Sequence, residues 1–215
     1  MSGTDLAAER RDYAGPRLLE NETPADPFEL FSTWLEQARA AQVLDATAMC
    51  ISTCSADGAP SSRMVLLKGQ DRRGFVFYTR YSTRKGADLL VNPRAALLFH
   101  WRELNRQVSI EGAVERLSRT ESEAYFVTRP RASQLAACAA SELGRVADAA
   151  ELERRLAAET ARFAERAVEM PRDWGGFRVS ARRFEFWQGR PSRFHDRLAY
   201  EPQPDGSWLR YRLAP

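Results

Sequence analysis

Positive side chains and aromatic rings crowd into one short stretch of the sequence, EFWQGRPSRFHDR (185–197). Within it Arg193, His195 and Arg197 occupy alternate positions, so an extended backbone would direct all three to one side. Such a face is costly to bury without anions, so it is either hydrated or holds a ligand. The flanking arginines disfavour the protonated imidazole and leave His195 neutral. The stretch therefore predicts a site for a flat, anionic ligand, with a structural histidine among solvated charges as the alternative.

Two further basic groups lie at the ends of predicted elements. On a strand over 61–68, the segment RMVLLK places Arg63 and Lys68 on opposite faces near its two ends. Arg84 and Lys85 begin a predicted helix over 82–92, where adjacent cations and free backbone N–H groups suit a phosphate. Charged strand ends and solvated helix starts are also common without any ligand, and that alternative stays open for both groups.

A fourth group combines a phenol, a guanidinium and a hydroxyl. Tyr125 and Arg129 are four residues apart, so they meet on one face if the helix continues through both. Ser133 follows a break at Pro130 that could turn its hydroxyl back toward them. The three groups suit a phosphate monoester, and a capped helix end with a surface arginine is the competing interpretation.

The composition is that of an ordinary globular protein. The chain has 215 residues, 44% hydrophobic and 28% charged, with a net charge of only +3. That charge, without a continuous basic aromatic face, argues against nucleic acid as a partner. We expect a cytoplasmic protein without a membrane segment, because no apolar run approaches about 18 residues and the first residues lack an apolar signal core.

The cysteines do not predict a metal or a disulfide. On one strand, Cys50 and Cys54 would lie about 13 Å apart, too far to be bridged. With only two histidines remote in sequence they make a poor zinc set, so we expect no metal. We interpret these two residues and Cys138 as small buried hydrophobes.

The pattern of elements predicts a strand-rich body with inserted helices. Residues 1–24 show no apolar periodicity and predict a flexible arm, and 25–215 predict a single domain. A helix should begin at Asp26, with Phe28, Phe31 and Trp34 on its apolar face. Further helices are expected over 82–92, 120–130, 132–144 and 147–167, the last with Leu152, Leu156 and Phe163 directed inward. Strands joined by short turns are expected over 48–55, 61–68, 75–79, 95–101, 106–117, 176–189, 193–201 and 207–215, with a turn over 69–74, which together indicate a barrel or sandwich.

The ordered set of motifs resembles the pyridoxine/pyridoxamine 5′-phosphate oxidase family. The resemblance runs from the ERRDY arm to the last residue and includes RMVLLK, FVFYTRYSTRKG, NRQVSIEG, YFVTRPRASQ, WGGFRV, EFWQGRPSRFHDR and the terminal RLAP. It implies a mainly β fold with inserted helices (α+β), an antiparallel, Greek-key-like FMN-binding split barrel. It also implies a homodimer with two flavin sites at the subunit interface.

The resemblance assigns roles residue by residue. Arg193 and His195 are the implied catalytic pair, which holds the pyridine ring of the substrate. The cofactor-binding positions are Arg63, Met64, Val65, Leu66, Leu67, Lys68, Tyr78, Thr79, Arg84, Lys85, Gln107, Glu142, Leu143, Trp174 and Arg197. The substrate-binding positions are Arg10, Arg11, Asp12, Tyr13, Lys68, Tyr125, Arg129, Ser133, Arg193, Phe194 and His195.

The implied reaction is oxidation of pyridoxine or pyridoxamine 5′-phosphate to pyridoxal 5′-phosphate. Hydride passes from the substrate to FMN, and molecular oxygen reoxidises the flavin and gives hydrogen peroxide. One departure from the family stands in the helical region after Ser133, where Cys138 replaces a tryptophan and Glu142-Leu143 replaces a Gln-Ser pair that reaches FMN. Two alternatives therefore remain: a relative acting on another substrate, such as a phenazine precursor, and a flavin carrier without turnover.

Overall fold

The computed structural model describes residues 12–141 and 144–215. They form two compact units, each described here by itself. The first combines residues up to Met49 with 97–110 and 182–215, and the second combines 50–96 with 111–181. Four strands contribute residues to both units.

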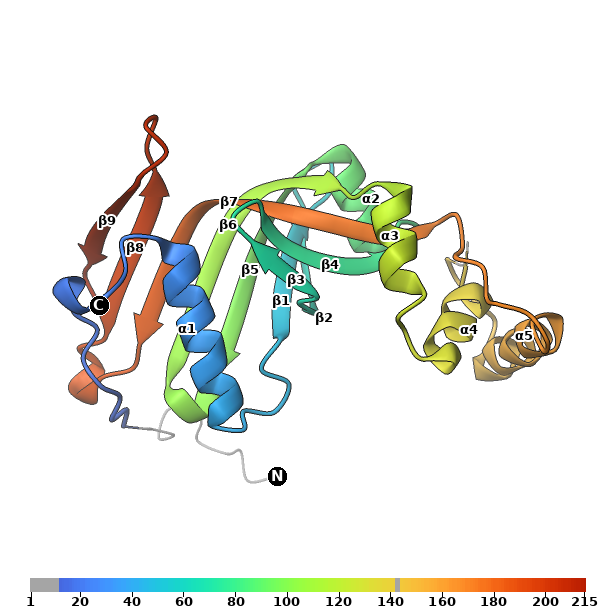
Figure 1. The fold of residues 1–215 in the computed structure, drawn as a ribbon, viewed down its shortest axis with the longest axis horizontal. Helices are drawn as coiled ribbons and strands as arrows, with labels where there is room; N and C mark the ends of the chain where they lie inside the picture. Colours follow the sequence, from blue (N-terminus) through green and yellow to red (C-terminus); the bar gives the residue numbers. More distant parts are fainter. Residues whose placement is uncertain (1–11, 142–143) are drawn as a thin grey trace, which may run out of the picture. The chain divides into compact units, whose positions relative to one another are not determined.

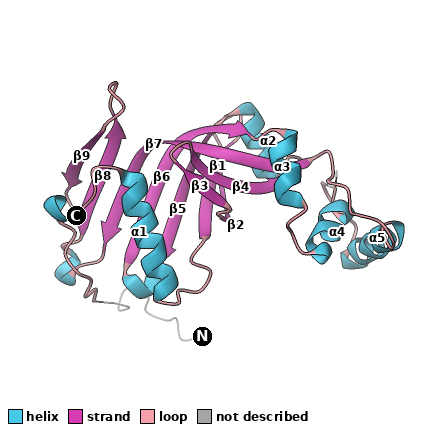
Figure 2. Cartoon of the chain, viewed as in Figure 1, coloured by secondary structure: helices cyan, strands magenta, loops and turns pink. Residues whose placement is uncertain are grey.

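The described residues form one nine-stranded sheet, in the order β2-β1-β5-β6-β7-β4-β3, with β8 paired to β7 and β9 paired to β8 (Figure 2). The pairs β3–β4, β4–β7, β7–β8 and β8–β9 are antiparallel. The strands are β1 Ala48–Cys54, β2 Pro60–Leu66, β3 Gly69–Asp71, β4 Gly74–Arg80, β5 Arg94–Trp101, β6 Arg106–Arg116, β7 Trp174–Gln188, β8 Asp196–Pro202 and β9 Trp208–Leu213. This matches the strand-rich interpretation, except that 69–71 pair as a short strand, so the predicted turn shrinks to the residues between β3 and β4.

In the first unit, α1 (Pro27–Ala40) lies alongside the strands (Figure 1). It begins as predicted, because the Asp26 side chain accepts a hydrogen bond from the backbone N–H of Phe28 at 2.9 Å. Its apolar face is buried as the spacing predicts: the ring of Phe31 lies 4.9 Å from that of Phe99, and the ring of Trp34 lies 5.3 Å from that of Phe186. This helix holds the strands that carry 185–197.

The described part of the predicted arm is tied to β8 and β9 of the same unit. The backbone N–H of Leu18 donates to Asp196 at 3.0 Å, and Arg212 donates to both carboxylate oxygens of Glu20. A short 3-10 helix, η2 (Glu20–Glu22), lies in this segment. Residues 1–11 of the predicted arm lie outside the described residues.

In the second unit, four helices flank the strands: α2 Arg84–Val91, α3 Arg119–Phe126, α4 Arg131–Ala139 and α5 Ala149–Arg162. The predicted break at Pro130 separates α3 from α4, and Figure 1 shows α4 beside α5. A core of apolar side chains joins α3, α4 and the end of α5 to the start of β7, including Phe126, Leu135, Phe163, Met170 and Trp174. This core positions the loop between α3 and α4.

The prediction for α5 is wrong in two respects. The helix ends at Arg162, and its two leucines are exposed, Leu152 at 41% and Leu156 at 40%. Only Phe163, at the C-cap, is buried as predicted. The spacing of apolar residues identifies the apolar face of a helix, but it does not show whether another element covers that face. Within the described residues no helix is both long and apolar enough to cross a membrane.

Candidate functional site

The residues predicted to bind ligands fall in both units. The second unit holds those between 63 and 85, together with Tyr125, Arg129, Ser133 and Trp174, and the first holds Gln107 and 193–197. Arg10 and Arg11, and the departure at Glu142 and Leu143, lie outside the described residues.

In the second unit, Arg63 of β2 is fixed by a network of hydroxyls and a carboxylate. Its guanidinium donates to Thr53 Oγ1 at 2.7 Å and to Ser61 Oγ. Both hydroxyls donate in turn to Asp88 Oδ2, at 2.6 and 3.1 Å. Asp88 is only 6% exposed and lies on α2, one turn after the predicted cations Arg84 and Lys85. The buried carboxylate therefore positions Arg63 through two neutral side chains.

Cations crowd around the start of α2, which begins at Arg84 as predicted. Burial lowers the pKa of Lys85, and the charges of Arg63 and Arg80 lower it further. Burial also lowers the pKa of Arg63, and Arg84 adds to the effect against the opposing influence of Asp88. The sequence analysis missed both Arg80 and Asp88. Charges this close repel one another unless an anion lies among them.

A cavity of about 360 Å³ opens beside this cluster. Three of the predicted polar side chains line it, Lys85, Arg129 and Ser133, together with Arg80. The described residues that line it are Thr79, Arg80, Thr83, Lys85, Arg129, Ser133, Ala136, Ala137 and Trp174. The structure thus brings Lys85, from the predicted group on α2, to a single cavity with Arg129 and Ser133, from the predicted group of the α3–α4 region.

A second cavity, of about 380 Å³, takes Lys68, Tyr78 and Tyr125 instead. Arg129 lies past the end of α3, so the prediction that it shares one helix face with Tyr125 is wrong. The chain leaves the helix before Pro130 because a residue that precedes a proline disfavours the helical conformation. Three stacked rings link the two cavities: Tyr78 lies 3.9 Å from Tyr125 and 5.5 Å from Trp174, between ring centroids. Trp174 is only 6% exposed, so the stack buries most of the ring predicted to contact FMN.

The other predicted positions of RMVLLK differ widely in exposure. Met64 is 63% and Leu66 43% exposed, whereas Leu67 is buried at 6%. Val65 is half-buried and Lys68 is exposed. Burial alternates along β2 as expected for a strand, but β2 ends at Leu66, so Leu67 and Lys68 lie past the end of the predicted strand.

In the first unit, the stretch around His195 is not extended as predicted. Pro191–Arg193 form a short 3-10 helix, and Ser192 and Arg193 have positive φ angles of 54° and 60°. Only Arg197 lies on a strand, so the three basic residues do not alternate along one face. The sequence RPSR carries no glycine to mark this left-handed turn, which is why the spacing argument failed.

The imidazole of His195 is neutral and oriented. Its Nδ1 accepts a hydrogen bond from the backbone N–H of Arg190 at 3.1 Å, so the proton lies on Nε2. Burial lowers the pKa of His195, and the charge of Arg193 lowers it further, in the direction that the sequence analysis predicts. Phe194 is 77% exposed and contributes little to packing. His195 can therefore present an Nε2–H donor to a ligand at neutral pH.

Two aromatic rings hold this imidazole in place. The rings of Tyr13 and Trp187 lie 5.2 and 4.6 Å from that of His195, between centroids. The structure thus brings together Tyr13 and His195, both predicted to bind substrate. Trp187 is not among the residues predicted to bind a ligand. Its alternation with the fully buried Phe186 is the sequence signal that could have placed it on the other face of the strand.

The remaining predicted positions of this unit are less informative. Arg197 donates to Glu185 at 2.8 Å and to the carbonyl oxygen of Ala214, so its charge is already paired. Gln107 on β6 is half-buried, and Asp12 is exposed.

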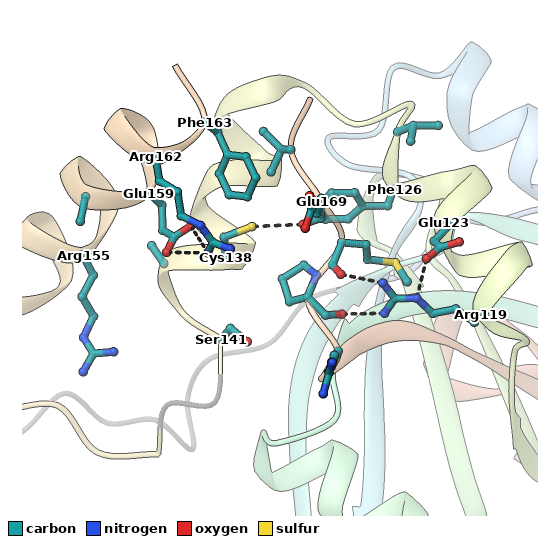
Figure 3. A pocket seen from close by; sticks show the side chains of 17 residues that line it. Arg119, Glu123, Phe126, Cys138, Ser141, Arg155, Glu159, Arg162, Phe163 and Glu169 are labelled. Atoms are coloured by element: carbon teal, nitrogen blue, oxygen red, sulfur yellow. Dashed lines mark hydrogen bonds and ion pairs between the residues drawn. The ribbon is translucent and has the colours of Figure 1, made fainter. Parts of the chain in front are cut away.

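A larger cavity, of about 900 Å³, lies among α3, α4, α5 and the segment before β7 (Figure 3). Of the predicted site residues that the structure describes, none lines it. Arg119 donates there to Glu123 and to the carbonyl oxygens of Met170 and Pro171, while Cys138 Sγ lies 3.5 Å from the carbonyl oxygen of Glu169. Arg119 and Cys138 therefore already have hydrogen-bond partners within the protein, so size alone does not make this cavity the site.

The cysteines are all free thiols, with Cys50 and Cys54 on β1 as expected, but all three are half-buried rather than buried as predicted. Within the ranges that the structure describes, no three histidine, cysteine or acidic side chains are grouped to hold a metal ion.

Comparisons with known proteins agree along the whole chain. Residues 35–169 match the family model described as pyridoxamine 5′-phosphate oxidase, and 174–215 match the pyridoxine 5′-phosphate oxidase C-terminal dimerisation region. The chain is 53% identical to a pyridoxine/pyridoxamine 5′-phosphate oxidase of Bordetella petrii, over 100% of both chains. It is 50% identical to one of Microcystis aeruginosa, over 98% of each.

Solved structures show the same fold. PhzG from Burkholderia lata, in complex with tetrahydrophenazine-1-carboxylic acid, has a TM-score of 0.87 at 28% identity, over 94% of this chain and 100% of that one. An FMN-binding protein of Nostoc punctiforme has a TM-score of 0.69 at 12% identity, over 90% of this chain and 100% of that one, and shows the fold alone. The predicted antiparallel split barrel with inserted helices is thereby confirmed. With both family models and relatives of about half identity spanning its length, the chain belongs to the pyridoxamine 5′-phosphate oxidase family.

Proposed function

We propose that this protein is an FMN-dependent oxidase that converts pyridoxine 5′-phosphate or pyridoxamine 5′-phosphate to pyridoxal 5′-phosphate. Oxygen is the electron acceptor and is reduced to hydrogen peroxide; with the amine substrate, water is also consumed and ammonia is released. The observation that carries the proposal is a sequence identity of 53% and 50%, over 100% and 98% of this chain, to two proteins named for this oxidase activity. The protein acts as a homodimer, since 174–215 match the dimerisation region of the family.

The donor set of the second unit fits a phosphate-bearing flavin. Arg63, Arg84 and Lys85 cluster at the start of α2. The buried Asp88 is linked to Arg63 through the hydroxyl groups of Thr53 and Ser61. The excess positive charge suits the phosphate of FMN. Bound FMN supplies the hydride acceptor and the centre that reacts with oxygen.

The chain's own residues bind and orient the substrate. In this proposal Arg129 and Ser133 bind its phosphate, because both line the 360 Å³ cavity and a guanidinium with a hydroxyl suits a phosphate monoester. His195 donates from Nε2 to the pyridine ring, and Arg193 holds the ring beside it. These groups contribute orientation and charge, and we assign them no proton transfer.

A direct assay tests the proposal. The purified protein should show a flavin absorption spectrum. In air it should convert both phosphorylated vitamers and form equal amounts of aldehyde and hydrogen peroxide. Without oxygen, either vitamer should bleach the flavin. A bound flavin that neither compound bleaches would contradict the oxidase and support a carrier.

Two variants separate cofactor from substrate binding. Arg193→Ala should reduce turnover strongly and retain flavin, whereas Arg84→Ala should release flavin. The exposed Arg172, which lies on the larger cavity, supplies the control, because Arg172→Ala should change neither property. Unchanged flavin retention in Arg84→Ala would refute the assignment of the flavin phosphate.

A second candidate function is oxidation of a phenazine precursor. The observation in its favour is the high TM-score to PhzG, although the identity of 28% is well below the 53% of the Bordetella petrii relative. A tricyclic carboxylic acid has no phosphate for Arg129 and Ser133. Anaerobic bleaching by a reduced phenazine carboxylate, but by neither vitamer, would favour this candidate.

A cytoplasmic location is part of the proposal. Cell fractionation of the source organism should recover the flavoprotein with cytoplasmic markers, and recovery with membranes or in the medium would contradict it.

A further inference from the structure

Two guanidinium groups on the 360 Å³ cavity have buried nitrogen atoms without partners. Nη1 of Arg80 and Nη1 of Arg129 are the two side-chain atoms, among the described residues, that are buried and make no hydrogen bond. Both residues line the cavity. A buried donor left unsatisfied costs on the order of 1–3 kcal/mol, more when it is charged. Two such atoms on one cavity therefore indicate a bound acceptor.

Arg80 is held so that its side chain remains available. It is the last residue of β4 and pairs with Trp174 of β7. Its carbonyl oxygen accepts from the Thr83 hydroxyl at 2.8 Å, which fixes the turn into α2. Its backbone is thus engaged, while Nη1 of its guanidinium is buried and makes no hydrogen bond with any described residue.

The surrounding charge specifies the chemistry of the acceptor. Arg80 is close enough to Lys85 to lower the pKa of that amine, and burial lowers the pKa of Arg129. Among the described residues, no acidic side chain lines the cavity. Ser133 adds a hydroxyl donor. Two guanidinium groups, an ammonium and a hydroxyl match a phosphate monoester dianion, which offers three strong acceptor oxygens.

We propose that Arg80 binds the phosphate of a ligand in this cavity, either beside Lys85 or beside Arg129 and Ser133. The inference deepens the proposed function and rests on it. The phosphate has two possible sources, FMN and the phosphorylated vitamer, which share this chemistry. In either case Arg80 is a binding residue that discriminates a phosphorylated ligand from its dephosphorylated counterpart.

The test compares each phosphorylated compound with its phosphate-free partner. Apoprotein carrying Arg80→Gln is titrated with FMN and with riboflavin by flavin fluorescence, and the holoprotein is titrated with pyridoxamine 5′-phosphate and with pyridoxamine. Loss of one charge-assisted contact should weaken one phosphorylated ligand about tenfold or more and leave its partner within about twofold. Arg80→Lys, which keeps the charge, should restore part of the loss, and Arg172→Gln should change nothing.

The outcomes separate the two sources and the two proposals. If only the affinity for FMN falls, Arg80 binds the phosphate of the flavin. If only the affinity for pyridoxamine 5′-phosphate falls, Arg80 binds the phosphate of the substrate. Equal weakening of phosphorylated and phosphate-free compounds, or no weakening of either, overturns the role of Arg80. A wild-type protein that binds FMN but oxidises neither vitamer refutes the proposed function, while the FMN and riboflavin titrations still decide the role of Arg80.

Discussion

Replacing the buried carboxylate of Asp88 tests whether it positions Arg63. Asp88→Asn removes the charge but keeps an oxygen that can still accept from Thr53 and Ser61, now 2.6 and 3.1 Å from Oδ2. A hydrogen bond to a charged group contributes about 1.5–3 kcal/mol, against about 0.5–1.5 for a neutral pair. With two bonds weakened by about 1 kcal/mol each, the free energy of unfolding should fall by about 2 kcal/mol, which corresponds to about 4–8 °C in Tm for a chain of this size.

The assay is urea unfolding followed by tryptophan fluorescence, without flavin or phosphate and at one fixed protomer concentration, since a dimer unfolds in a concentration-dependent way. Asp205→Asn is the matched control. Asp205 also accepts from a serine hydroxyl, Ser207, but is exposed in the turn between β8 and β9, so its loss should cost no more than about 0.5 kcal/mol.

A double-mutant cycle then asks whether Asp88 acts on Arg63. Arg63→Met keeps the stem and removes the donors. Side chains in one hydrogen-bond network show interaction energies of about 0.5–3 kcal/mol, so Asp88→Asn should cost less in the Arg63→Met background. Full additivity, or an Asp88→Asn protein as stable as the wild type, would refute the positioning role.

Three further predictions follow from other parts of the structure. The pKa of His195, measured by proton NMR, should lie below the ordinary value of about 6.5, and Arg193→Ala should move it upward; a titration unaffected by that substitution would mean that burial alone sets it. The Arg212 guanidinium lowers the pKa of Glu20 from 4.5 to about 2, so stability from this pair is present above about pH 4.5 and lost as the pH falls toward 2. Arg212→Ala should therefore flatten the decline in urea midpoint over this range, and an unchanged pH profile would contradict the pairing. At Gly175 an added Cβ would collide with a tyrosine hydroxyl, so Gly175→Ala should lower the free energy of unfolding by about 1–3 kcal/mol in the same urea assay, and a neutral result would show that the ring can move.

Local signals explain the successful predictions. The Asp26 cap and the spacing of Phe28, Phe31 and Trp34 act within a few residues, so α1 was predictable from its own segment. The same holds for Arg84 and Lys85 at the start of α2. The family and the split-barrel fold were predictable because many short motifs of the family occur along this chain in the family's order.

The failures have a common physical origin. Leu152 and Leu156 follow a helical apolar pattern, but no sequence pattern says whether a neighbouring element will cover them. Alternation around Arg193 was argued for an extended backbone, and a left-handed turn without glycine breaks it. Arg129 leaves the face of Tyr125 because the chain bends before Pro130.

Residue types and their order along the chain were sufficient for the family, the fold class and an inventory of groups able to bind phosphate, since these depend on local chemistry and spacing. Tertiary structure alone decided which cations share a cavity and which are already paired. Arg80 and Arg129, distant in sequence, line one cavity and each have a buried nitrogen without a partner, whereas Arg197 is neutralised by Glu185. The reason is physical: the energy of a buried charge depends on what surrounds it in space, and those neighbours come from segments far apart in the chain.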